Sequence, residues 1–487
     1  MQNYFKRFRD NIIGINQSFL SPYGVKKILY ADWIASGRLY SPIEDRFTNA
    51  IGPFVANTHT EATETGIRMT KAYHLAHQKI KEHVNAGPKD VIITTGYGMT
   101  GAIVKFQRIL GLKTPCQSDD ADCKREEKRP VVFITHMEHH SNHTSWFETF
   151  ADVVQLHPNK HNLVDLDELN IMLYKYRDRE LKIGSFTACS NVTGISTPYH
   201  KMARIMHENG GYCFIDFAAS APYHEMNMHP ADPMESLDAI FFSPHKFLGG
   251  PGSSGVLIFN SELYKGHSPD QPGGGTVDWT NAWGEFKYID DIEAREDGGT
   301  PGFLQAMRTA LAIELKNQMG VTNIKKREAE LTALAFEVLS KVPGIQILAE
   351  DEKERLGVIS FYIEPIHYNL IVKLLNDRYG IQVRGGCACA GTYGHYLLDV
   401  TYEKSHEITS RINSGDFSKK PGWVRLSLHP VMTDEEVRFI ANALCDIAEN
   451  HNEWILDYNY DKHKNEFIHK NETGGEFDKV SEWFELA

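Results

Sequence analysis

The 487-residue sequence has no long apolar run. Its first twenty residues, MQNYFKRFRDNIIGINQSFL, contain basic side chains but neither the continuous apolar segment nor the small-residue cleavage site of a secretory signal. No later run approaches the roughly 20 apolar residues that a membrane-spanning helix needs. The sequence therefore predicts a cytoplasmic protein that does not span a membrane.

Clusters of basic residues are also missing. The chain has 51 lysines and arginines against 64 aspartates and glutamates, a formal charge of -13, and the basic residues are scattered. A nucleic-acid-binding surface needs a dense basic patch, so the composition argues against such a partner. Small molecules or other proteins are the expected partners.

Cysteine is scarce as well. Seven cysteines, an odd number, are spread over the whole chain, which does not fit a disulfide framework. We therefore expect reduced thiols, one of which is a candidate for chemistry.

Short apolar runs alternate with helix-like segments through the first half of the chain. This alternation predicts an α/β fold with a large, mostly parallel seven-stranded sheet covered on both faces, and ligands bind such a sheet at the C-terminal ends of its strands. The runs begin at Val91, Val131, Val153, Leu181, Tyr212, Ala239 and Gly255.

A long helical pattern from Phe303 to Ser340 follows, and the shorter strands and helices after it predict a smaller α+β unit. The polar segment 115–130 reads as a surface insertion. The expected parts are an N-terminal segment (1–30), a large cofactor-binding domain (31–302), a small C-terminal domain (303–450) and a tail (451–487).

The stretch GYGMTG, residues 96–101, follows a predicted strand and precedes a helical pattern. Glycines at a helix start expose backbone N–H groups that can bind a phosphate. A nicotinamide dinucleotide is the competing interpretation, but it needs an acidic residue at the end of the next strand, and that strand ends in His136. We favour a single phosphate.

Three different polar groups follow other predicted strands. Asp216 ends one, Lys246 lies in SPHK after another, and His139 follows a third. A lysine that can form a Schiff base, a carboxylate for the pyridine nitrogen and a histidine that can lie over the ring are the groups that pyridoxal 5′-phosphate requires. The sequence therefore predicts this cofactor.

Several longer motifs resemble one enzyme family. The run DAIFFSPHKFLGGPGSSGVLIF resembles the cofactor-lysine segment of class V aminotransferase-family enzymes, and IQVRGGCACAG resembles the arginine and cysteine loop of cysteine desulfurases and selenocysteine lyases. ADWIASG, MEHHSNHTSW, SNVTGISTP, GGGT and EDGGTP fall in the order of that family. The resemblance spans about residues 30 to 430. It implies the type I fold of pyridoxal-phosphate enzymes.

The resemblance also implies roles for individual residues. Lys246 would hold the cofactor and act as general base, His139 would stack on the ring, and Cys389 would be the sulfur-accepting nucleophile. Other cofactor contacts would come from Met99, Thr100, Asp216, Ser243, His245 and Thr276. Thr276, in GGGT, matches a residue that reaches the phosphate from the neighbouring subunit in related enzymes, so a homodimer is implied. Substrate-binding residues would be Asn191, Arg384 and His59, and a sulfur-acceptor protein would be a partner.

Four positions depart from the family pattern. Ala219 stands where relatives carry a Gln or His near the cofactor's phenolic oxygen, and Cys387 and Ala388 stand where desulfurases often carry two histidines. His59 is followed by threonine instead of the usual arginine. Cys387 is either a bystander or a second, relaying thiol.

Other functions remain open from the sequence. The same cofactor would support β-lysis, transamination or epimerisation of another amino acid, with Cys389 uninvolved, and a binding protein without turnover is a further alternative. A metal site is not expected, because the histidines around His136 lack the cysteine pair of zinc deaminases.

Overall fold

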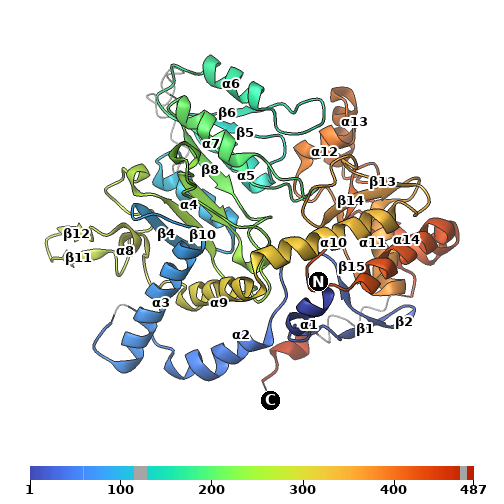
Figure 1. Ribbon diagram of the computed structural model, residues 1–487, viewed down its shortest axis with the longest axis horizontal. Helices are drawn as coiled ribbons and strands as arrows, with labels where there is room; N and C mark the ends of the chain where they lie inside the picture. Colours follow the sequence, from blue (N-terminus) through green and yellow to red (C-terminus); the bar gives the residue numbers. More distant parts are fainter. Residues whose placement is uncertain (59, 114–128, 472–479, 487) are drawn as a thin grey trace.

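The computed structural model describes residues 1–58, 60–113, 129–471 and 480–486, and it has an α/β fold (Figure 1). A seven-stranded sheet has the strand order β4-β10-β9-β8-β7-β5-β6. The neighbouring pairs from β9 to β6 are parallel, and β10 runs antiparallel to both β4 and β9. All seven predicted strands are confirmed. Their bounds are β4 Asp90–Thr95, β5 Val131–Ile134, β6 Asp152–Gln155, β7 Lys182–Thr187, β8 Tyr212–Asp216, β9 Ala239–Phe242 and β10 Gly255–Asn260.

Apolar side chains on both faces of this sheet are buried, because successive residues of a strand point to opposite sides. Val131 and Phe133 pack with helices α3, α6, α7 and α9, whereas Val132 and Ile134 pack with α4 and α5. We call this sheet with its helices the large unit. The helix bounds are α3 Glu64–His83, α4 Met99–Ile109, α5 His140–Phe147, α6 Leu166–Lys175, α7 Tyr199–Glu208 and α9 Phe303–Met319.

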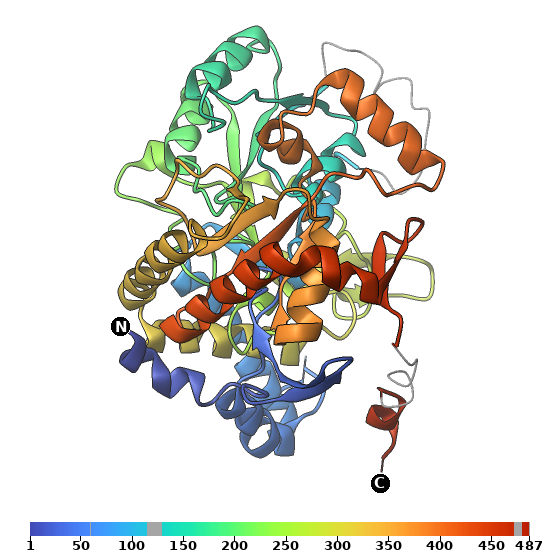
Figure 2. The same cartoon turned by 90° about the vertical axis from the view of Figure 1, so that its right-hand side faces the viewer.

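A second sheet has the order β13-β14-β17-β16 and packs with α10, α11 and α14; we call this assembly the small unit. Figure 2 shows α14, in red, crossing it. The cysteine loop enters α12 and then α13, which precede β17. The bounds are β13 Ile345–Ile347, β14 Val358–Ile363, β16 Arg384–Gly386, β17 Trp423–Ser427, α10 Val321–Leu339, α11 Tyr368–Leu374, α12 Gly391–Leu397, α13 Tyr402–Asn413 and α14 Asp434–Trp454.

Shorter elements join these units at their edges. Near the N-terminus, β3 pairs with β15 of the segment that leads to the cysteine loop. The remaining bounds are α1 Gln2–Arg9, β1 Ser18–Ser21, β2 Gly24–Lys27, β3 Leu29–Tyr30, α2 Ser41–Arg46, β11 Val277–Thr280, β12 Phe286–Tyr288, α8 Ile292–Glu296, β15 Ile381–Gln382, β18 Tyr458–Asp461 and β19 Glu466–His469.

The long helical pattern from Phe303 to Ser340 forms two helices instead of one. Gly320 ends α9 with a φ of 76° and α10 begins at the next residue. Only glycine adopts such a conformation at little cost, so this residue permits the break between the two helices. Within the tail, β18 and β19 form an antiparallel hairpin. The domain boundaries stay predictions, and most of the predicted insertion at 115–130 lies outside the described residues.

Among the described residues, no helix is both long and apolar enough to cross a membrane.

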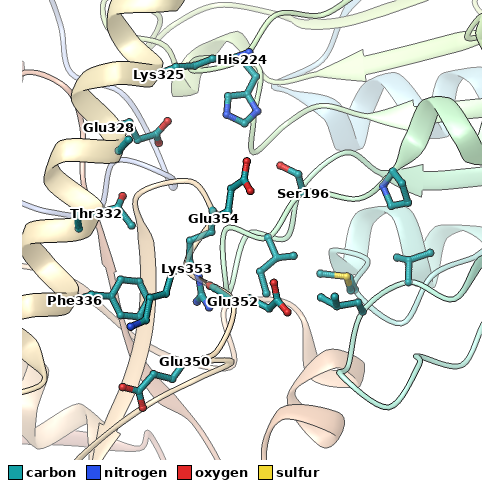
Figure 3. A pocket seen from close by; sticks show the side chains of 18 of the residues that line it. Ser196, His224, Lys325, Glu328, Thr332, Phe336, Glu350, Glu352, Lys353 and Glu354 are labelled. Carbon is teal, nitrogen blue, oxygen red and sulfur yellow. Dashed lines mark hydrogen bonds between the residues drawn. The ribbon is translucent and has the colours of Figure 1, made fainter.

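A cleft of about 990 Å³ separates α10 from loops of the large unit (Figure 3).

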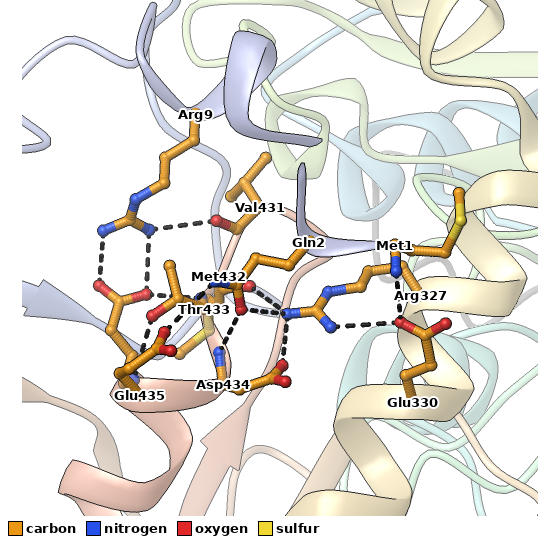
Figure 4. Close-up of polar contacts among 11 residues, drawn as sticks. Met1, Gln2, Arg9, Arg327, Glu330, Val431, Met432, Thr433, Asp434 and Glu435 are labelled. Atoms are coloured by element: carbon orange, nitrogen blue, oxygen red, sulfur yellow. Dashed lines mark hydrogen bonds and ion pairs between the residues drawn. The ribbon is translucent and has the colours of Figure 1, made fainter. Parts of the chain in front are cut away.

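The N-terminal helix α1 is held against α10 and α14 by charged contacts (Figure 4). Arg327 of α10 is 2% exposed, pairs with Asp434 at 2.8 Å and donates to the carbonyl of Met432 at 2.9 Å and to Oε1 of Gln2. Arg9 of α1 forms a two-pronged ion pair with Glu436. These contacts join three segments that are far apart in the sequence.

We expect Arg327→Met to lower the free energy of unfolding by about 2 kcal/mol, because one buried guanidinium serves several acceptors. Lys6→Met is the matched control, since Lys6 forms only an exposed pair with Asp10 and should change stability by less than about 0.5 kcal/mol. Urea unfolding monitored by tryptophan fluorescence measures both variants. Equal unfolding midpoints for Arg327→Met and wild type would contradict a stabilising role for these contacts.

Candidate active site

A cavity of about 220 Å³ opens where the C-terminal ends of the large-unit strands meet the cysteine loop of the small unit. The structure brings ten predicted residues together in its lining: Met99, Thr100, His139, Asn191, Asp216, Ser243, His245, Lys246, Arg384 and Cys389. Thr276 is buried elsewhere, where its hydroxyl donates to the carbonyl of Gly273 at 2.7 Å. His59 lies outside the described residues. The sequence therefore predicted most of this lining.

One wall of the cavity is the glycine turn between β4 and α4. Gly98 has a φ of 138°, and a Cβ atom there would lie 3.0 Å from Oγ of Ser243 and 3.4 Å from the His245 ring. The amide of Met99, the first residue of α4, donates to that Ser243 oxygen at 2.9 Å. Thr100 Oγ1 lies 2.6 Å from Oγ of Ser141. The turn thus gathers small hydroxyl groups around the start of a helix.

The cavity also contains a buried acid and an amine. Asp216, the last residue of β8, is 3% exposed and accepts from the amide of Ala218 at 2.8 Å. Burial raises its pKa to about 6. Lys246 follows β9 in a short 3₁₀ turn, and enclosure of its amine lowers its pKa to about 8, although Asp216 opposes the shift. The site therefore favours the uncharged form of this lysine more than water does.

His139 lies where β5 gives way to α5. Its Nδ1 accepts from the amide of Ser141 at 3.1 Å, which places any proton of the neutral ring on Nε2. Burial, together with the charge of Lys246, lowers its pKa to about 3. His139 is thus a neutral aromatic ring at the edge of the cavity.

The cysteine loop is fixed by its backbone. Asn191 donates from Nδ2 to the carbonyl of Ala388 at 2.7 Å, and the amide of His140 donates to the carbonyl of Cys389 at 2.8 Å. The His140 ring also accepts from the amide of Gly391 at 3.0 Å. These contacts make His140 an anchor of the loop.

The loop itself is a tight left-handed turn. The amide of Ala390 donates to the carbonyl of Cys387 at 3.0 Å, and Ala388 and Cys389 have φ values of 50° and 57°. Such values are uncommon outside glycine and occur often at functional sites. Cys389 is exposed and lines the cavity, whereas Cys387 is partly buried against the cluster that contains Tyr393 and Trp423.

Two arginines share one carboxylate beside this loop. Arg384 and Arg425 face each other across β16 and β17. Asp32 accepts from Nε of Arg384 at 3.0 Å and from Nη2 of Arg425 at 2.8 Å, which offsets the repulsion between like charges on paired strands. Sequence reasoning did not assign Asp32. Its only signal was its place in the motif ADWIASG.

The sheet order and the placement of Asp216 and Lys246 after neighbouring strands are those of fold type I among pyridoxal-phosphate enzymes. The chain belongs to the class V aminotransferase family, whose model matches residues 29–440.

Known proteins similar to this chain carry a consistent description. A probable cysteine desulfurase of Halalkalibacterium halodurans is 27% identical over 77% of this chain and 86% of its own length. One of Staphylococcus epidermidis is 28% identical over 75% and 84%. The solved cysteine desulfurase of Thermococcus onnurineus NA1 has a TM-score of 0.72 at 20% identity, covering 91% of this chain and 98% of its own. That of Escherichia coli has a TM-score of 0.71 at 22% identity, covering 92% and 98%.

Proposed function

We propose that the protein is a pyridoxal 5′-phosphate-dependent cysteine desulfurase. It releases alanine from L-cysteine and keeps the sulfur as a persulfide on Cys389. The observation that carries the proposal is the convergence of Lys246, Asp216 and Cys389 on one cavity. The relatives named probable cysteine desulfurases support it.

The glycine turn fits the cofactor's phosphate. The volume that a Cβ at Gly98 would take is left free beside Ser243 and His245. The first amides of α4 and the hydroxyl of Thr100 supply donors there, and a helix N-terminus favours an anion. Met99, Thr100, Ser243 and His245 would therefore hold the phosphate.

The ring would lie between Asp216 and His139. Asp216 forms no ion pair among the described residues, and a protonated pyridine nitrogen would give this buried carboxylate a cationic partner. When bound, pyridoxal phosphate supplies an aldehyde that can form a Schiff base with an amine, and a ring that acts as an electron sink. Lys246 would bind its carbonyl carbon, and the amine, once freed by substrate, would remove the proton from the substrate Cα.

The substrate would be held by its carboxylate. Arg384 uses Nε for Asp32, which leaves its two Nη groups for a two-pronged contact. Asn191 has a second amide N–H beyond the one bound by Ala388. Cys389 would then attack the substrate sulfur. An S–S bond forms, the C–S bond breaks with its electron pair passing to carbon, and that carbon takes up a proton as alanine leaves.

A homodimer with Thr276 contributed in trans, and a protein that accepts the persulfide sulfur, complete the proposal. The β11–β12 hairpin after Thr276 exposes Trp279, Trp283 and Phe286, which is typical of a surface that a partner covers. Sedimentation at micromolar concentration tests the dimer. The described cysteines are free thiols, which supports a reducing compartment such as the cytoplasm.

Product identity tests the function. Purified protein would be incubated with L-cysteine and a reductant, and the organic product released with sulfide identified. Alanine in equal amount to sulfide is expected. Pyruvate with ammonia would instead indicate β-elimination and would remove the role of Cys389.

Arg384→Lys should raise KM for L-cysteine by about 10- to 100-fold with a smaller change in kcat, because lysine keeps the charge but loses the fork that binds a carboxylate. Steady-state alanine formation measures both constants. Lys419→Arg is the control, since this lysine is exposed in a turn outside the cavity. An unchanged KM in Arg384→Lys would contradict carboxylate binding by this residue.

A further inference from the structure

The cleft of about 990 Å³ in Figure 3 is separate from the candidate active site and larger than it. One wall is α10 and another is the loop that leads from β13 towards β14. Across from them lie turns of the large unit that carry Ser196 and His224. A volume of this size suits a small organic ligand.

Glu328 of α10 is the most unusual residue of this cleft. Its side chain is 4% exposed, and Oε1 accepts from the amide of Gly357 at 2.9 Å. No ion pair to it exists among the described residues, and Lys325, one turn earlier, is exposed to solvent. Burial raises the pKa of Glu328 to about 7. The Gly357 amide and the charge of Lys325 oppose this shift without cancelling it. A buried carboxylate without an ion-pair partner is costly, so the site favours a positively charged ligand.

Thr332 lies one turn further along the same face of α10. It is 4% exposed, and its Oγ1 has no hydrogen-bond partner among the described residues. Figure 3 shows Glu328 and Thr332 on the α10 wall, with His224 and Ser196 across the cleft. An unsatisfied buried hydroxyl needs an explanation, and a ligand N–H in the cleft would supply it.

The other titratable groups around Glu328 are compatible with a cationic ligand beside its carboxylate. His224 is neutral at pH 7, since burial lowers its pKa to about 4, and its ring can accept a hydrogen bond. The guanidinium of Arg355 donates to three backbone carbonyls of its own loop. The thiol of Cys189 and the phenol of Tyr223 lie behind Glu328, and burial raises the pKa of each.

The rim of the cleft is acidic. Glu337, Glu350, Glu352 and Glu354 outnumber the exposed amines of Lys325 and Lys353. Within the described residues, no set of three acidic, histidine or cysteine side chains is placed to hold a metal ion. A ligand that brings its own N–H donors therefore suits the site better than a bare metal.

We propose that this cleft binds an alkylammonium ligand of the diamine or polyamine class. One ammonium group contacts the Glu328 carboxylate and donates to Thr332 Oγ1, and a second lies among the rim glutamates. The ring of His224 accepts from the same ligand. Nothing in this site depends on the chemistry proposed for Cys389.

Titration calorimetry of the full chain with spermidine, at physiological ionic strength, tests the proposal. Saturable binding of one spermidine per chain is expected, about tenfold tighter at pH 8 than at pH 6, because the ionised fraction of a carboxyl with a pKa near 7 rises from about one tenth to about nine tenths. Binding should release a proton, which appears as a heat that depends on the buffer.

Variants test whether Glu328 is responsible for spermidine binding and for its pH dependence. Glu328→Gln keeps an oxygen for the Gly357 amide and should weaken binding at pH 8 at least tenfold, with the pH dependence lost. Thr332→Val should weaken it several-fold. Glu449→Gln, at an exposed residue of α14 outside the cleft, should stay within twofold of wild type.

Three results would overturn the proposal. These are an absence of saturable binding, equal binding by Glu328→Gln and wild type, or equal weakening by Glu328→Gln and Glu449→Gln, which would indicate diffuse attraction to the acidic surface. Circular dichroism of each variant checks that it is folded. If Glu328→Gln does not fold, Thr332→Val and the pH dependence of wild type still decide.

Discussion

Lys246→Ala is expected to reduce alanine formation from L-cysteine by at least about 10³-fold, because the variant loses both the cofactor-binding amine and the general base. In the wild-type protein the pKa of the Lys246 amine is about 8, which fits an amine that releases and accepts a proton near neutral pH. The measurement is alanine production under saturating cofactor and substrate.

A second readout separates lost chemistry from lost folding. Borohydride reduction followed by mass spectrometry should give a cofactor adduct on Lys246 in wild type and none in the variant. Lys246→Arg is the matched control for charge, and it too should lack the adduct, since a guanidinium does not form the imine. A normal rate in Lys246→Ala would refute the proposed role and reopen a function without this lysine.

Cys389→Ser is expected to abolish persulfide formation, with a loss of about 10³-fold or more in sulfide release under reductant. The cofactor adduct on Lys246 should persist, because Cys389 is held by its own loop and makes no hydrogen bond to Lys246 among the described contacts. Thiol alkylation after incubation with L-cysteine, followed by peptide mass spectrometry, locates the added sulfur.

Cys387→Ser is the control, two residues away in the same turn. Because Cys387 lies outside the cavity lining, this variant should keep persulfide formation on Cys389. If Cys387→Ser were the inactive variant and Cys389→Ser the active one, the nucleophile would be Cys387. Equal sulfide release by Cys389→Ser and wild type would leave no cysteine nucleophile at this position.

The large sheet could be predicted from the sequence because each strand is a short, continuous apolar run. Strands that are buried on both faces typically have this local pattern. Asp216, Lys246 and His139 could be placed for the same reason, since each lies at the end of such a run or a few residues after it. The break at Gly320 was missed because the apolar pattern continues across it, and a single glycine inside a helical pattern does not by itself decide between a break and a continuous helix.

The remainder of the site depends on contacts between distant segments. Asp32 meets Arg384 and Arg425 only after the N-terminal segment packs beside β17. The His140 ring reaches Gly391 across 251 residues. Glu328 and Thr332 look like ordinary polar residues of an amphipathic helix until the fold buries them. Pairings of this kind leave no local pattern in a single sequence.

The cysteine loop is held by main-chain atoms, namely the carbonyls of residues 387 to 389 and the amides of residues 390 and 391. Residue 389 contributes only its carbonyl, which every amino acid has, so these contacts do not depend on which side chain stands at position 389. Evolution can therefore exchange the reactive group without redesigning its support. The positive φ values at Ala388 and Cys389 set the limit, because they disfavour β-branched residues and confine the exchange to slender side chains.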